Sequence, residues 1–178
     1  MDVIILNVLA LQRELASWDG KDTALLAALY QKLQNHDDLA SALIDLLGQV
    51  DCQKAAGWLL RQHLKHDVIL DETESDDLMR SLKLVQDNTA RLNLLQSLDH
   101  VVIEDRNVDR LIWFLDDCMQ SGHTFIKAWS YHGYYCLACQ HPGYRDQVTQ
   151  MLEMGLTDEP ASVRARIRHC LKAGYADA

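Results

Sequence analysis

The sequence predicts an all-α fold, a right-handed α-solenoid in which antiparallel helix pairs stack side by side. A basic residue recurs near the start of helix-like segments, at Lys54, Arg91, Lys127 and Arg164, which gives intervals of 37, 36 and 37 residues. Apolar residues recur at helical spacing, and no stretch has a convincing strand pattern. A constant period of this length is typical of stacked helix pairs, each too small to bury its apolar face alone.

Short polar turns rich in Gly, Asn, Asp and Pro divide the chain into about ten helices. Asp, Asn or Ser precedes most of the apolar runs, as expected of helix N-caps. The β-branched run at 101–103 is too short to build a sheet. The predicted helices span 3–16, 22–34, 37–48, 51–66, 75–86, 88–99, 107–120, 123–140, 143–155 and 160–173.

We expect one domain, 1–178, with two parts. Residues 1–36 hold two amphipathic helices that cap the stack. In the second of these helices, Leu25, Leu29 and Leu33 share one face. Residues 37–174 form the helix-pair repeats, and the recurring basic residue always falls in the second helix of a pair.

Composition and charge narrow the function classes. Of the 178 residues, 48% are apolar and 24% are charged, which is ordinary for a globular protein. Seventeen basic against twenty-six acidic residues give a net charge of −9, so nucleic acid is an unfavoured partner. Five cysteines without a secretory signal predict reduced thiols and a cytoplasmic protein. The apolar segment at 3–11 is too short to span a bilayer, so no membrane association is expected.

The turn and helix near the C-terminus resemble the HEAT repeat consensus. Asp158-Glu159-Pro160 leads into Val163-Arg164-Ala165, as the acidic turn of that family leads into a second helix opening with Val-Arg. The segment 123–128 resembles the same element with a weaker turn. The resemblance covers about residues 37–174. It implies an armadillo-like α-solenoid whose second helices line a concave face, and it implies no reaction, because the family includes scaffolds, transport factors and a few enzymes.

The recurring basic residues have two interpretations. In the structural one, each cation pairs with an acidic turn residue, such as Asp51 or Asp158, or caps backbone carbonyls between repeats. In the functional one, the cations line a groove that holds a phosphate backbone or an acidic peptide. Arg166, Arg168 and Lys172 extend the basic character of the last helix and favour the second interpretation, whereas the overall charge disfavours it.

The helix at 123–140 is unusually aromatic, with Trp129, Tyr131, Tyr134 and Tyr135 following Phe125. Such a helix on a concave face offers a stacking platform to a peptide, a base or a small ligand. Alternatively, Phe125, Trp129 and Tyr134 belong to the core. If the protein has a binding surface, we place it here.

Two further sets of residues have the types found in a zinc site and in a DNA-repair active site. His132, Cys136 and Cys139 share one helical face, and with His141 they have the residue types of a Zn²⁺ site, although a single CxxC is also common in helical cores. The HEAT-like DNA alkylation-repair glycosylases use a tryptophan, an aspartate and an arginine on the concave face. Trp113, Asp116 or Asp117, and Lys127 are loosely similar in type, but their spacing is not diagnostic.

No phosphate-binding loop, nucleophile elbow or metalloprotease motif is present in the sequence. We therefore predict a non-catalytic module that binds a protein or peptide on its concave face, without cofactor or metal. The alternative is a DNA-binding or DNA alkylation-repair-type protein. The oligomeric state is left open. The predicted binding residues are Lys127, Trp129, Tyr131, Tyr135, Arg91 and Arg164.

Overall fold

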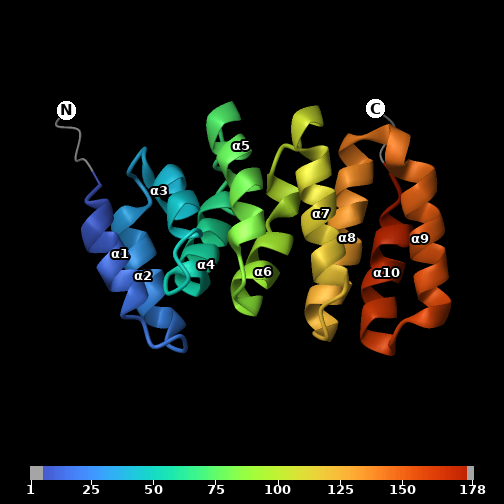
Figure 1. Cartoon of the computed structure of the whole chain (residues 1–178), viewed down its shortest axis with the longest axis horizontal. Helices are drawn as coiled ribbons and strands as arrows, with labels where there is room; N and C mark the ends of the chain where they lie inside the picture. Colours follow the sequence, from blue (N-terminus) through green and yellow to red (C-terminus); the bar gives the residue numbers. More distant parts are fainter. Residues whose placement is uncertain (1–5, 176–178) are drawn as a thin grey trace. The chain divides into compact units, whose positions relative to one another are not determined.

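The computed structural model describes residues 6–175, which form helices and connecting turns without a strand in that range (Figure 1). The prediction of an all-α fold is therefore confirmed for these residues, whereas residues 3–5 of the first predicted helix lie outside them. The ten α-helices of the described chain are α1 (Val8–Ala16), α2 (Thr23–Leu33), α3 (Leu39–Leu46), α4 (Gln53–Leu64), α5 (Glu72–Ser81), α6 (Asn88–Leu95), α7 (Val108–Met119), α8 (Thr124–Gln140), α9 (Arg145–Asp158) and α10 (Ala161–Ala173).

The helices divide between two compact units, Met1–Val101 and Val102–Ala178. In the N-terminal unit, α4 contacts α1, α2, α3 and α6, and α3 also packs on α5. In the C-terminal unit, α8 contacts α7, α9 and α10. The helices that carry the recurring basic residues thus pack directly on each other within each unit, α4 on α6 and α8 on α10. No helix of the described chain combines the length and apolarity needed to cross a membrane.

The contact between α4 and α6 depends on small residues. A Cβ atom added to Gly57 would lie 3.1 Å from the Cα atom of Ala90, so the two backbones approach more closely than a side chain would allow. Ala56 and Ala90 are both fully buried at this level of the helices. Small residues therefore allow α4 and α6 to pack closely.

Gln53 joins the turns of successive helix pairs. Its side chain is fully buried. Its amide nitrogen donates to the carbonyl oxygens of Leu47, at 3.0 Å, and Leu84, at 2.8 Å. Its amide oxygen accepts hydrogen bonds from the backbone nitrogens of Gln86 and Asp87, at 2.8 and 3.0 Å. One side chain therefore provides partners for four buried or partly buried backbone groups.

The fifth helix begins earlier than the sequence pattern predicts. The stretch from Asp71 to Ser75 was expected to be a loop, but α5 already begins at Glu72. Asp71 accepts a hydrogen bond from the backbone nitrogen of Glu74, and the Glu74 carboxylate accepts one from the backbone nitrogen of Asp71. This capping box, together with acidic residues at the positive end of the helix dipole, starts the helix in a segment without apolar periodicity.

Charge is unevenly distributed between the two units. Residues 1–101 contain nine basic and sixteen acidic residues, a net charge of −7, whereas residues 102–178 contain eight and ten, a net charge of −2. Within the C-terminal unit, α10 carries four basic residues and no acidic one. The strongly acidic character of the protein therefore belongs mainly to the N-terminal unit.

Candidate functional site

A groove lies between α8 and α10 in the C-terminal unit. Its volume is about 440 Å³. Phe125, in the first turn of α8, is 71% exposed at its edge, and Trp129, one turn further on, is half-buried. The lining residues are Phe125, Ala128, Trp129, Ser162, Ala165, Arg166 and His169. The small residues Ala128, Ser162 and Ala165 leave room between the helices, so the aromatic rings remain accessible.

Trp129 is fixed by neighbours on both sides. The guanidinium carbon of Arg166 lies 3.8 Å from the centre of the indole ring, a close cation–π contact. The imidazole of His132 meets the indole edge-on, with ring centres 5.0 Å apart. His132 is itself buried, and its Nδ1 atom lies 3.6 Å from the Sγ atom of Cys170. The groove therefore presents a preorganised aromatic ring with a cation on its face.

The groove is also cationic. Arg166 lines it, and the exposed His169 follows one turn later on α10. The other basic residues of this helix are Arg164, Arg168 and Lys172, and no carboxylate offsets them within the helix. A ligand that combines an apolar or aromatic side chain with a negative charge matches this surface best.

Lys127 and Tyr131, both predicted as binding residues, are engaged within the protein. The Lys127 Nζ atom lies 2.7 Å from the Glu159 carboxylate, and the buried Tyr131 hydroxyl donates a hydrogen bond of 3.1 Å to the same oxygen. Burial, and then Glu159, raises the pKa of Tyr131 far above its ordinary value. This cluster joins α8 to the turn between α9 and α10, so both residues have a structural role here.

The other two tyrosines of α8 also donate hydrogen bonds to groups of the C-terminal unit. The hydroxyl of Tyr134 lies 2.6 Å from the Asp116 carboxylate, and that of Tyr135 lies 2.8 Å from the Gly174 carbonyl. The Tyr135 ring stacks on Tyr175, with ring centres 5.7 Å apart. Burial and the Asp116 carboxylate raise the pKa of Tyr134. Tyr135 thus holds the segment after α10 against α8.

Among the recurring cations, three have structural partners. Lys54 donates to the Gly20 carbonyl at 2.6 Å, Arg91 donates through Nε to the Val85 carbonyl at 2.9 Å, and Lys127 pairs with Glu159 as predicted. The structural interpretation of the recurring cations gives Arg164 a carboxylate partner as well, and this is wrong for the described part of the chain. The Nε atom of Arg164 is buried there without a hydrogen-bond partner.

Of the residues considered for zinc, His132 and Cys136 place possible ligand atoms within 4.8 Å of each other. In contrast, His141, Asp116 and Lys127 have other partners. His132 faces Cys170, whereas the His141 Nε2 atom lies 2.7 Å from the Ile103 carbonyl oxygen. The cysteines, Cys136 and Cys139 among them, are free thiols. Of the set similar to the repair glycosylases, Asp116 accepts from Tyr134, Lys127 pairs with Glu159, and Trp113 is 54% exposed.

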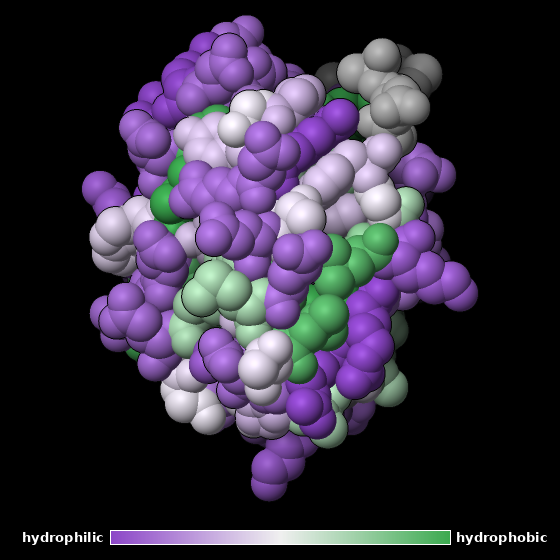
Figure 2. All heavy atoms as spheres, turned by 90° about the vertical axis from the view of Figure 1, so that its right-hand side faces the viewer, coloured by the Kyte–Doolittle hydropathy of each residue, from purple (hydrophilic) through white to green (hydrophobic). Residues whose placement is uncertain are grey.

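A second hollow, of about 390 Å³, lies beside Tyr131 and is lined by Met151, Met154 and Gln150 among others. Figure 2 shows the molecule from the C-terminal side, where hydrophilic side chains surround a small apolar patch. Met154 is 58% exposed, but the charged groups at this hollow are the carboxylates Asp158 and Glu159. The hollow has neither an exposed aromatic ring nor a cation, so the groove between α8 and α10 is the stronger candidate.

Two features of the groove were not predicted from the sequence. Phe125 was assigned to the core in one of the two interpretations of this helix and was not among the predicted binding residues, yet it is largely exposed. Arg166 was noted only as part of a basic helix, although it stacks on Trp129. One signal in the sequence could have indicated this. Arg166 follows Arg164 by two residues, and residues two apart on a helix lie on different faces, so the two arginines cannot have the same surroundings.

No protein-family model, curated protein or solved structure matches this chain. Its function must therefore be inferred from the geometry of the residues themselves.

Proposed function

We propose that this protein is a non-catalytic helical module that binds a partner protein or peptide in the groove between α8 and α10. The observation that carries the proposal is the exposed ring of Phe125 beside Trp129 and Arg166, in a groove of about 440 Å³. Aromatic and arginine side chains that are fixed before binding lose little conformational entropy, which is why they dominate binding energy at protein interfaces.

The chemistry of the groove defines the partner. An apolar or aromatic side chain of the ligand would fit between Phe125 and Trp129, where small residues of α10 form the opposite wall. A neighbouring carboxylate of the ligand would reach the Arg166 guanidinium, which offers several donors in a fixed plane. We infer a short segment that combines an apolar anchor with Asp or Glu.

The wider architecture in this proposal is the α-solenoid of HEAT-like helix pairs. The packing of α4 on α6, and of α8 on α10, supports it, because successive second helices lie side by side in such repeats. The recurring cations contribute to the architecture rather than to the ligand, since Lys54, Arg91 and Lys127 bond to groups of their own unit.

A DNA-binding or alkylation-repair-type function is the second candidate. The four basic residues of α10, without an acidic one, favour it. The internal pairing of Lys127 and Asp116, and the net charge of −9, count against it. Few free cations remain to release counterions from a duplex, so binding to DNA at physiological salt should be weak.

Selection from a random-peptide library tests the proposal. The purified protein should enrich peptides that pair an aromatic or aliphatic residue with Asp or Glu. Arg166→Glu should weaken binding of an enriched peptide at least about tenfold. Arg168→Glu is the matched control, because Arg168 lies on the same helix outside the groove lining and undergoes the same charge change. Equal losses in the two variants, or enriched peptides without acidic residues, would contradict the proposal.

A further inference from the structure

The N-terminal unit has a second groove, distinct from the one to which the proposed function belongs. α1 and α2 each pack against α4, and open space remains between α1 and α2. Two hollows, of about 370 and 250 Å³, follow one another along α1 and share Glu14 and Leu29. The two hollows adjoin at these shared residues, and we call them together the α1–α2 groove.

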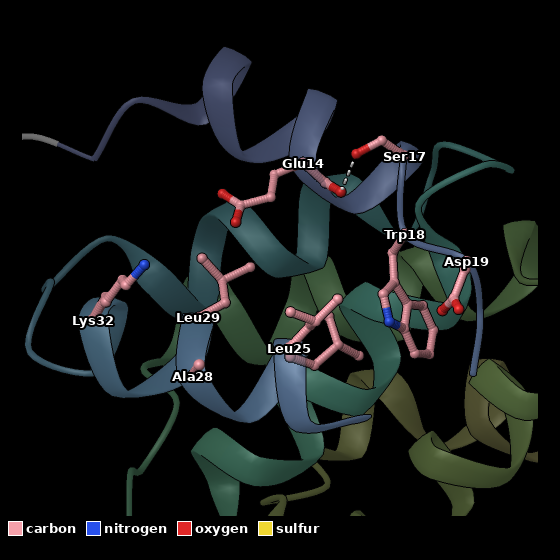
Figure 3. A pocket seen from close by; sticks show the side chains of 9 residues that line it. Glu14, Ser17, Trp18, Asp19, Leu25, Ala28, Leu29 and Lys32 are labelled. Carbon is pink, nitrogen blue, oxygen red and sulfur yellow. Dashed lines mark hydrogen bonds between the residues drawn. The ribbon is translucent and has the colours of Figure 1, made fainter. Parts of the chain in front are cut away.

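The α1–α2 groove has an apolar floor and an accessible wall. Leu26 and Leu29 of α2 are nearly fully buried at its base, whereas Leu25 is 60% exposed. Figure 3 shows Leu25 beside the indole of Trp18, with Glu14 reaching over from α1 and Lys32 at the other end of α2. The indole nitrogen of Trp18 donates to the Asp22 carbonyl at 2.8 Å, so the ring is held in place.

The charges at this groove are mainly negative. Among the lining residues, Glu14 and Asp19 stand at the rim against Lys32, and the unit as a whole carries a net charge of −7. The Lys54 ammonium lies 5.5 Å from the centre of the Trp18 indole, but it donates to the Gly20 carbonyl at 2.6 Å. The Asp19 carboxylate accepts hydrogen bonds from the backbone nitrogens of Lys21 and Asp22, which lower its pKa and keep it ionised. A ligand with basic residues beside its apolar face complements this surface.

The dimensions of the groove fit a helix. On the side of α1, one hollow is lined by residues between Leu6 and Glu14 and the other by residues between Glu14 and Asp19. The midpoints of these ranges are between six and seven residues apart, which corresponds to roughly 10 Å at a helical rise of 1.5 Å per residue. On a helical ligand, two side chains on one face separated by two turns are about 10 Å apart. Two apolar anchors at i and i+7 would therefore reach the two hollows together.

We propose that the α1–α2 groove binds a basic amphipathic helix of a partner protein. The apolar anchors of this helix contact Leu25, Leu29 and Trp18, and its lysine or arginine side chains face Glu14 and Asp19. The surface differs in charge from the groove between α8 and α10, which selects an acidic ligand. The protein would thus hold two partners of opposite charge, one on each unit.

The test uses a synthetic helical peptide with two leucines seven positions apart on a background of alanine and lysine. The sequence contains four tryptophans, and their indole N–H signals in a two-dimensional NMR spectrum are assigned with single Trp→Phe substitutions. The peptide should shift the Trp18 signal and leave the Trp129 signal unchanged. The same peptide with glutamate in place of lysine should not bind.

Two matched variants locate the site. Leu25→Ser should weaken binding of the lysine peptide at least about tenfold, because it removes an exposed anchor contact. Leu84→Ser, a leucine of the same unit that is 48% exposed outside the groove, should not. Circular dichroism should show both variants folded, since both side chains are largely exposed.

Three results would overturn the inference: equal binding of the lysine and glutamate peptides, an unshifted Trp18 signal, or equal loss in the two variants. A dimer of the free protein that Leu25→Ser dissociates would assign the groove to a second copy of this chain instead. None of these outcomes involves Phe125 or Arg166, so failure here is distinguishable from failure of the proposed function.

Discussion

The Lys127 ammonium lies 2.7 Å from the Glu159 carboxylate, which also accepts the hydroxyl of Tyr131. The Glu159 side chain is only 10% exposed, and the Lys127 side chain 33%. The pair therefore links α8 to the turn before α10 and keeps the two helices that form the groove in position.

Glu159→Ala should destabilise the C-terminal unit. It leaves the buried Tyr131 hydroxyl without an acceptor and Lys127 without its counter-charge. We expect a loss of about 1.5–3 kcal/mol in the free energy of unfolding, since Lys127 retains partial access to water. Urea unfolding followed by circular dichroism measures it. Glu153→Ala, at an exposed position of α9, is the control and should change stability little; equal effects would show that the cluster is not a special contact.

Gln53→Met should destabilise the N-terminal unit strongly. Methionine has nearly the same shape but cannot hydrogen-bond to the carbonyls of Leu47 and Leu84 or to the amides of Gln86 and Asp87. Buried backbone groups left without partners should cost about 3 kcal/mol or more in total. The control is Gln86→Met, the same change at an exposed side chain. If Gln53→Met lowered the free energy of unfolding no more than Gln86→Met does, the role assigned to Gln53 would be contradicted.

His63 should make stability depend on pH. Burial lowers its pKa below the ordinary 6.5; the Glu74 carboxylate opposes this shift, and His66 adds to it. The Tyr30 hydroxyl lies 3.4 Å from the His63 Nδ1 atom. The unfolded chain binds a proton at His63 more readily than the folded protein does. The contribution of His63 to the free energy of unfolding is therefore fully present above about pH 6.5, and it is lost as the pH falls through the lowered folded-state pKa.

The corresponding measurement compares urea unfolding of the natural protein and of His63→Gln between about pH 7.5 and about pH 5. The natural protein should lose stability more steeply on acidification, by at most about 1.4 kcal/mol per pH unit for this one proton. His100→Gln, at an exposed histidine, should retain the steep profile. A His63→Gln profile as steep as that of the natural protein would exclude this residue as the source.

The sequence was sufficient to predict the helices and the pairing of second helices within each unit. The helices that carry Lys54 and Arg91, 37 residues apart, are α4 and α6, and those that carry Lys127 and Arg164 are α8 and α10; both pairs pack on each other. Periodicity records which face of a helix is apolar, and it is therefore a good guide to the elements.

The pattern could not predict the start of α5 or the surface of α8. α5 begins through side-chain capping by Asp71, which leaves no apolar period. On α8, aromatic residues occur on every face, so spacing alone did not separate the exposed Phe125 from the buried Tyr131. Which ring is exposed depends on the neighbours contributed by α9 and α10, and therefore on tertiary packing that the spacing of residues along α8 does not contain.

Phe125→Ser tests the central claim most directly. The natural protein and the variant are titrated with an enriched acidic peptide and with a short DNA duplex at about 0.15 M salt. Because Phe125 is 71% exposed, the variant should keep its melting temperature. We predict that it loses peptide binding at least about tenfold, while neither protein binds DNA tightly. Unchanged peptide binding, or tight and salt-sensitive binding of the duplex, would contradict the assignment of this groove to a protein partner.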